Sequence, residues 1–168
     1  MKAKARIISL LACSISLVLA ASLIGCAKKP KLVGDDYFGY LAIPSNWIEQ
    51  RDSTAGFEMV QYVDPNKSAV ITIMVYTAVD LDGALANMES LFAIIKYENY
   101  EESVISLDSG SLTPVYKISF FYTDFDRDIV IYLFEGPDGL TRYVSVEGTS
   151  QQVQEGADII ESSYAFSN

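Results

Sequence analysis

The sequence contains no histidine and only two cysteines among its 168 residues. Without histidine, the chain lacks the usual general base at neutral pH, a Ser-His-Asp triad and the commonest zinc ligand. A Ser-Lys pair or a pair of carboxylates could still catalyse a reaction, but no motif marks such a pair. We therefore expect a protein that is not an enzyme and that carries no cofactor.

Charge is also distributed unevenly along the chain. No acidic residue precedes Asp35, whereas all 22 acidic residues and only six basic residues follow from that point, which gives this part a net charge of −16. Such a charge repels phosphate backbones, so we expect no nucleic-acid partner. It attracts cations and basic proteins, and it also keeps an exported protein soluble.

The first 25 residues have the pattern of a secretory signal peptide. Lys2, Lys4 and Arg6 form a basic start, and residues 7–24 are apolar or small apart from four serines. A basic region, an apolar core and a small-residue cleavage site are the three parts of such a peptide. A run of about eighteen apolar residues is also long enough for a permanent transmembrane helix. The residues that end the run favour cleavage.

The run ends in Leu23-Ile24-Gly25-Cys26, which resembles the lipobox of bacterial prolipoproteins. In such a motif the small Gly25 admits the peptidase, and the thiol of Cys26 receives the lipid, acyl chains such as palmitate. Leu10-Leu11-Ala12-Cys13 is similar, but it leaves six apolar residues after Arg6, fewer than the roughly 7–15 of a usual core. We predict cleavage between Gly25 and Cys26.

The lipobox implies an extracytoplasmic lipoprotein, anchored to the cell membrane or, in a Gram-negative bacterium, to the outer membrane. Two or more acyl chains bind a bilayer stably. Residues 26–34 would form a tether whose lysines each gain about 1 kcal/mol beside anionic head groups. Cys13 leaves with the signal peptide and Cys26 is acylated, so the mature chain keeps no thiol for a disulfide, a zinc site or catalysis.

Residues 35–168 are predicted to form one α+β domain with the order β-β-β-α-β-β-β-β-α. Short turns between strands make neighbouring strands antiparallel. Residues 129–134 are apolar at every position, which indicates a strand covered on both faces. We therefore predict an α/β/α sandwich on a central antiparallel sheet. The expected strands are residues 37–43, 57–63, 69–77, 104–107, 115–123, 129–135 and 140–147, and the expected helices run from Asp80 or Asp82 to about Tyr97 and from Thr149 or Ser150 to about Tyr164.

Two short stretches resemble the PsbP-like superfamily, which includes an extrinsic photosystem II protein, a Ran-binding import factor and many bacterial lipoproteins. Residues 37–47, with the sequence YFGYLAIPSNW, are similar to its opening strand and Pro-x-x-Trp corner. Residues 159–166, with the sequence IIESSYAF, are similar to its terminal helix. The resemblance implies the predicted fold and a binding or assembly subunit, with no catalytic set to carry over.

Three further patterns have a functional and a structural interpretation. Asp124, Asp126, Asp128 and Glu135 occupy positions 1, 3, 5 and 12 of a calcium-loop template, but Ile129 replaces the glycine at position 6, so a solvated hairpin tip is favoured. Trp47 is expected to plug one end of the core, with ligand stacking as the alternative. The tyrosines fit strands better than a sugar site, because most lie within strand runs.

These observations leave two main functional hypotheses. The first is a binding or assembly module, held at the membrane through the lipid on Cys26, that presents a sheet-and-helix surface to another envelope protein. The second is a lipoprotein that binds a small solute in a pocket beside the sheet. An enzyme is the least favoured class.

Overall fold

The computed structural model describes residues 29–54, 57–66, 68–107 and 114–166. The predicted signal peptide, the cleavage site at Gly25, the lipidation site at Cys26 and the start of the tether lie outside these residues. Within the described residues, no helix has the length and apolar character needed to cross a membrane.

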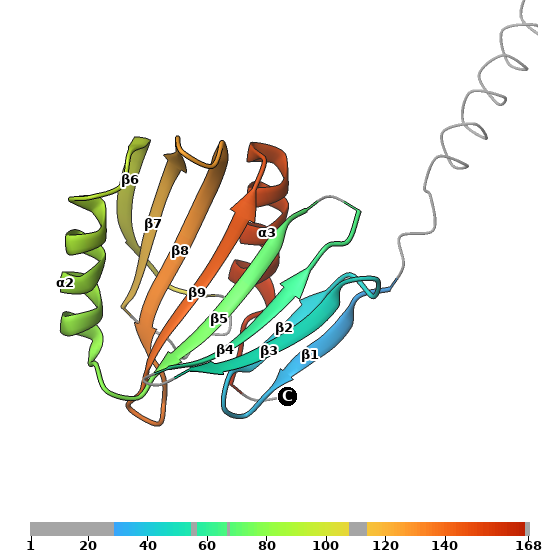
Figure 1. Ribbon diagram of the computed structural model, residues 1–168. Helices are drawn as coiled ribbons and strands as arrows, with labels where there is room; N and C mark the ends of the chain where they lie inside the picture. The colour runs from blue at the N-terminus through green and yellow to red at the C-terminus, as the bar shows by residue number, and fades with distance from the viewer. Residues whose placement is uncertain (1–28, 55–56, 67, 108–113, 167–168) are drawn as a thin grey trace, which may run out of the picture.

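The protein is a mixed α+β domain with a seven-stranded antiparallel sheet, a two-stranded sheet and two described helices (Figure 1). The large sheet has the strand order β3-β4-β5-β9-β8-β7-β6, and β1 and β2 form the small sheet. The elements are β1 (Lys31–Asp35), β2 (Gly39–Ile43), β3 (Ile48–Thr54), β4 (Phe57–Val63), β5 (Val70–Tyr76), α2 (Leu81–Phe92), β6 (Tyr97–Ile105), β7 (Val115–Tyr122), β8 (Arg127–Glu135), β9 (Thr141–Gly148) and α3 (Ser150–Ser163).

The predicted element order was wrong by two strands. β1 begins at Lys31, inside the segment assigned to the tether, and β3 occupies a stretch that was not assigned. Pattern analysis misses both strands, because β1 is short and pairs with β2 in a separate small sheet, and β3 is a polar edge strand with the sequence IEQRDST. In addition, α2 ends at Phe92 instead of near residue 97, and β6 begins at Tyr97 instead of residue 104.

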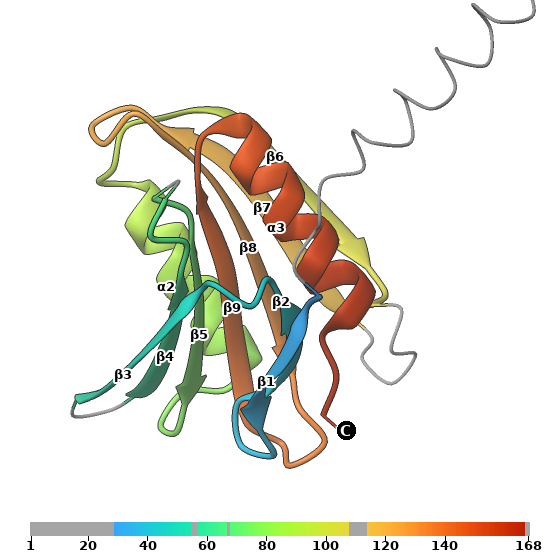
Figure 2. The ribbon, with the colours of Figure 1, turned by 90° about the vertical axis from the view of Figure 1, so that its right-hand side faces the viewer.

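The two helices lie on opposite faces of the large sheet (Figure 2). β8 shows this best, since Val130, Tyr132 and Phe134 belong to the core cluster under α3, whereas Ile131 and Leu133 belong to the cluster under α2. Successive side chains of a strand point to opposite faces. The prediction that residues 129–134 are covered from both sides is therefore confirmed.

The helix starts follow the predicted capping signals. The Asp80 carboxylate caps α2 by accepting a hydrogen bond from the Gly83 N–H at 2.9 Å, and the Gln152 side chain accepts from the Thr149 N–H at the start of α3. Further along α3, a Cβ atom at position 156 would collide with the Val146 side chain. Gly156 thus lets α3 approach β9 closely.

The β1–β2 hairpin is held by the C-terminal end of the domain. Tyr40 and Ala165 exchange two backbone hydrogen bonds of 2.7 and 3.1 Å, and the buried Tyr164 hydroxyl donates to the Phe38 carbonyl at 2.7 Å. Leu41 and Ile43 of the hairpin are fully buried in the core cluster on the α3 side. The hairpin therefore packs on the same face as α3.

A fully buried arginine joins this hairpin to the β8–β9 turn. The Arg142 guanidinium donates to the carbonyls of Tyr37 and Leu140 and to the Asp138 carboxylate, at 2.7–3.2 Å. Its Cζ also lies 5.2 Å from the centre of the Phe166 ring. A buried charge needs such a set of partners, because its desolvation is costly.

Candidate functional site: an open apolar sheet face

The face of the large sheet that carries α2 is only partly covered. α2 packs over β7 and β8, where Ile118, Phe120, Ile131 and Leu133 are buried beneath it. On the same face, Tyr143 of β9 and Tyr76 of β5 pack against the cluster under α2, whereas no described element packs over the rest of β5, β4 and β3. Figure 1 shows α2 at the β6–β8 side of the sheet, away from β3 and β4.

The register shows which side chains this uncovered area presents. Buried residues such as Val60 and Ile73 point to the α3 side, so their neighbours along the strand point to the α2 side. We call the resulting surface the open face. Its apolar members are Ile48, Met59, Val63, Val70, Met74, Tyr76 and Tyr143, which the pairings Ile48–Val63, Val63–Val70, Met59–Met74 and Met74–Tyr143 bring side by side.

The apolar side chains of the open face keep part of their surface in solvent. Ile48 is 50% exposed, and Met59, Val63, Val70 and Met74 are half-buried. Tyr76 and Tyr143 are also half-buried and pack against the cluster under α2. Burial raises the pKa of Tyr143 to about 12, and burial likewise raises the pKa of Tyr76. Both hydroxyls are thus neutral at physiological pH, and the apolar part of the open face carries no charge.

Two pairs of polar side chains within the open face interact with each other. Between the two apolar rows, the Gln61 amide donates a hydrogen bond of 3.1 Å to the Thr72 hydroxyl. At one end, Arg127 lies 3.6 Å from the Glu147 carboxylate. A partner that covered this surface would therefore leave few polar groups without a hydrogen bond, which limits the cost of desolvation.

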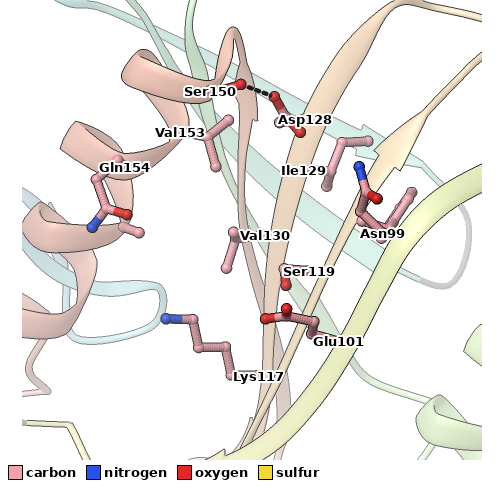
Figure 3. A pocket seen from close by; sticks show the side chains of 12 residues that line it. Asn99, Glu101, Lys117, Ser119, Asp128, Ile129, Val130, Ser150, Val153 and Gln154 are labelled. Carbon is pink, nitrogen blue, oxygen red and sulfur yellow. Dashed lines mark hydrogen bonds between the residues drawn. The ribbon is translucent and has the colours of Figure 1, made fainter.

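A groove lies on the other face of the sheet, between α3 and the strands β6, β7 and β8 (Figure 3). This α3 groove has a volume of about 350 Å³. Its strand wall carries Asn99, Glu101, Lys117 and Ser119, and the Ser150 hydroxyl at its upper end donates to Asp128 at 2.5 Å. Polar side chains on an uncovered strand indicate a surface adapted to water.

Lys117 of the groove wall forms an ion pair with α3, because its ammonium lies 2.7 Å from the Glu161 carboxylate. The same carboxylate accepts a hydrogen bond of 2.7 Å from the Tyr132 hydroxyl. Burial and this hydrogen bond raise the pKa of Tyr132 well above its usual value. Tyr132 therefore stays neutral and adds no charge beside Lys117 and Glu161.

The acidic residues of the calcium-loop template are not brought together. Asp128 binds Ser150, Asp124 lies 3.7 Å from the Lys96 ammonium, and Asp126 adopts a positive φ of 54° in the hairpin turn. Glu135 lies at the far end of β8, as expected for a strand that leaves the turn. Among the described residues, no group of three or more potential ligands is placed to hold a metal ion.

Trp47 lies where the sequence placed it, in the core. It is 7% exposed and belongs to the cluster on the α3 side, so the prediction that it plugs the core is confirmed. The Lys31 ammonium donates to its carbonyl at 2.9 Å. A cavity of about 200 Å³ touches Trp47, Asp64 and Gln152. Because Trp47 is buried, little of its indole is available for stacking.

The tyrosines also follow the structural interpretation. Tyr62, Tyr132 and Tyr164 are fully buried. Tyr37 packs edge-on against Phe38 at 5.1 Å, and the Tyr40 hydroxyl donates to Asp36 at 2.7 Å. Aromatic rings of this kind stabilise the core and its border, as expected for strands rich in aromatic residues.

Sequence reasoning missed the open face. The signal was present, because β4 and β5 place apolar residues on both faces, as β8 does. The pattern shows that a face is apolar, but it does not show which strands a helix covers. No protein-family model matches this chain, and no curated protein matches it either.

Proposed function

We propose that the protein is an extracytoplasmic lipoprotein that binds or assembles another envelope protein and has no enzymatic activity. In this proposal the signal peptide is cleaved after Gly25, and lipid on Cys26 anchors the chain to the membrane. The pattern of residues 1–26 supports the anchor, since a basic start, an apolar core and a small residue before the cleaved bond define such a signal.

The open face is the observation that carries the proposal. Soluble proteins seldom expose large contiguous apolar patches, and those that they expose often mark interaction sites. Full burial of a Val, Ile or Met side chain gains about 1.5–3 kcal/mol. Part of this gain is still available at Ile48, which is 50% exposed, and a smaller part at Met59 and Met74, which are half-buried. A protein partner that covers the open face would gain this free energy of burial.

The contrast with the other face supports this interpretation. Where α3 leaves β6 and β7 uncovered, the strands present Glu101, Lys117 and Ser119. Where α2 leaves β4 and β5 uncovered, they present Met59, Met74 and valines. Two uncovered areas of one sheet thus differ in polarity. The apolar area is the one suited to a protein partner.

The position of the β1–β2 hairpin also fits the proposal. The β1–β2 hairpin, through which the predicted tether would join the domain, packs on the α3 side. A tether that enters there leaves the open face free while the lipid holds the domain at the membrane. We also propose that the architecture is a PsbP-like α/β/α sandwich with an incomplete helix layer, a fold whose other members mostly act as binding or assembly subunits.

A small-solute binding protein is the second candidate, and the α3 groove is the observation that favours it. Its volume of about 350 Å³ falls within the usual range of about 300–1,000 Å³ for small-molecule sites. Its lining is more polar than that of most such sites. A solute bound there would carry donors for Glu101 and Asp128.

Affinity isolation of the full-length protein from native membranes, with its lipid anchor intact, tests the first candidate. Ile48→Glu places a charge on the open face, and Leu32→Glu is the matched control on β1, because both side chains are 50% exposed. We expect a specific membrane protein to copurify with the wild type and the Leu32 variant and to be lost from the Ile48 variant. Equal recovery with all three would refute the open face as the binding surface.

A thermal-shift screen of small solutes tests the second candidate. Stabilisation that survives Ile48→Glu but is lost in Glu101→Gln would assign ligand binding to the α3 groove. That result, together with no copurifying protein, would replace the first candidate by the second.

A further inference from the structure

The dimensions of the open face match those of one α-helix. Neighbouring strands lie about 4.8 Å apart, so the four strands β9, β5, β4 and β3 span about 14 Å from the border with α2 to the edge of the sheet. A helix with its side chains is about 10 Å across, and packed helices lie about 8–10 Å apart. One helix therefore fits beside α2 on this face, in the part of the layer that no described element of the chain occupies.

The apolar side chains are spaced for such a helix. Val63 and Val70 are separated from Met59 and Met74 by four residues along their strands, about 13 Å. A helix covers this length with about nine residues, so apolar residues at i, i+3 or i+4, and i+7 would contact both pairs. Methionine side chains adapt readily to the shape of a docked partner.

The adjacent sheet edge is a poorer place for a partner. β3 is the edge strand, and it carries Glu49, Arg51 and Asp52. Arg51 pairs with Glu49 at 2.7 Å and with Asp35 of β1 at 2.9 Å. Charged side chains on an edge strand disfavour the addition of another strand. A partner is therefore expected to pack on the face of the sheet and not along its edge.

The acidic residues beside the open face favour a basic partner. Asp52 and Glu135 are exposed on this side of the sheet, and Arg127 at its other end is already paired with Glu147. A second copy of this chain would bring the charges of two strongly acidic domains together, at a cost in free energy. A partner with basic residues beside its apolar stripe would instead be attracted.

From these observations we propose that the open face receives a basic amphipathic helix of the partner protein, packed beside α2 on β9, β5 and β4. This inference rests on the proposed function and specifies it further. The apolar stripe of the helix covers Met59, Val63, Val70 and Met74, and its lysines or arginines approach Asp52 and Glu135.

Site-specific photo-cross-linking in the full-length, membrane-anchored protein tests the contact. A photoreactive residue replaces Met74 on the open face or, as a control, Leu32 on β1. We expect the probe at position 74 to give a cross-link whose site, located by mass spectrometry, lies in a segment with apolar residues at helical spacing and a net positive charge. A cross-link to a second copy of this chain, or to an acidic or irregular segment, would overturn the inference but not the proposed function.

Charge reversal then tests the basic character of the helix. The double variant Asp52→Lys with Glu135→Lys should lower the cross-link yield at low salt by about tenfold, since electrostatic steering changes association rates by 10-fold or more. Glu98→Lys with Asp158→Lys applies the same change in net charge away from the open face and should have little effect. Equal yields from the two double variants would overturn the inference. If the probe at position 74 gave no cross-link at all in the protein without charge reversals, the proposed function would be refuted as well.

Discussion

Arg142 donates two hydrogen bonds to the carbonyl oxygen of Tyr37, from Nε at 3.2 Å and from Nη2 at 2.8 Å. The two residues are 105 positions apart in the sequence. This contact joins the β1–β2 hairpin to β9 through a side chain that is fully buried.

Arg142→Met should lower the free energy of unfolding by about 3 kcal/mol, because removal of one member of a buried charged network leaves its partners unsatisfied. Arg142→Lys keeps the charge but loses the fork of donors, so we expect an intermediate loss. Urea titrations of both variants provide the measurement. An unchanged midpoint for the methionine variant would show that the network contributes nothing to stability.

Asp138→Asn should change how stability depends on pH. Burial raises the pKa of the Asp138 carboxyl, but hydrogen bonds from Arg142 and from the Leu140 N–H lower it more, so its pKa in the folded state lies below the usual value. The ion pair therefore stabilises the fold above the unfolded pKa of about 3.9 and loses this contribution as the pH falls through the lower folded value.

The effect should be small, at most about 1 kcal/mol, because the Asp138 side chain is 42% exposed and is screened by solvent. Melting temperatures between about pH 6 and pH 2 will show it. Wild type and variant should converge at the acid end of this range. A constant difference down to the lowest pH would mean that the carboxylate charge is not the cause.

Trp47→Ala should destabilise the domain by about 3–5 kcal/mol, as expected for truncation of a large buried aromatic residue. Trp47 is 7% exposed within the core cluster on the α3 side. Urea denaturation followed by circular dichroism measures the change. Phe125→Ala is a suitable control, because that ring is 65% exposed and its loss should cost much less.

Cys26→Ser should release the protein from the membrane fraction or leave it as an uncleaved precursor, because the thiol of Cys26 is the predicted lipid acceptor. Cys13→Ser should change neither lipidation nor fractionation. Metabolic labelling with a fatty acid and fractionation of the cells measure both. Labelling that depends on Cys13 and persists without Cys26 would reverse the assignment.

Millimolar calcium should raise the melting temperature only slightly, and about 0.3 M KCl should abolish the shift, because exposed charges are screened within about 8 Å at physiological ionic strength. Asp126→Asn should leave this small response unchanged, since Asp124, Asp126 and Asp128 do not converge with Glu135. A shift of several degrees that resists salt and is lost in the Asp126 variant would establish a specific site.

The parts of the fold that the sequence predicted are those with strong local signals. Asp64 and Pro65 mark the turn between β4 and β5, and the observed strands, Phe57–Val63 and Val70–Tyr76, lie within one residue of those expected. Capping chemistry predicted that α2 starts at Asp80 or Asp82, and the structure has Asp80 as the cap. Turn residues and caps act over a few positions, so a single sequence reveals them.

The missed parts depend on contacts between distant residues. β3 has no apolar face of its own and is a strand because each of its residues pairs with β4. The pattern predicts that the helix runs to about Tyr97, where β6 begins, because Phe92 and Ile95 keep a helical spacing although α2 has already ended at Phe92. The open face was missed for a similar reason, since the position of α2 across the sheet is set by tertiary packing.

The exchange of backbone hydrogen bonds between Tyr40 and Ala165 has a consequence for the order in which the chain folds during synthesis. β2 meets this partner only after residue 165 has left the ribosome, so the β1–β2 hairpin docks fully only after all strands of the large sheet have been synthesised. Closure of such distant contacts is slow, because the loop entropy is lost before the contacts form. The β1–β2 hairpin and the segment around Ala165 are therefore expected to join the fold last, after the large sheet has formed.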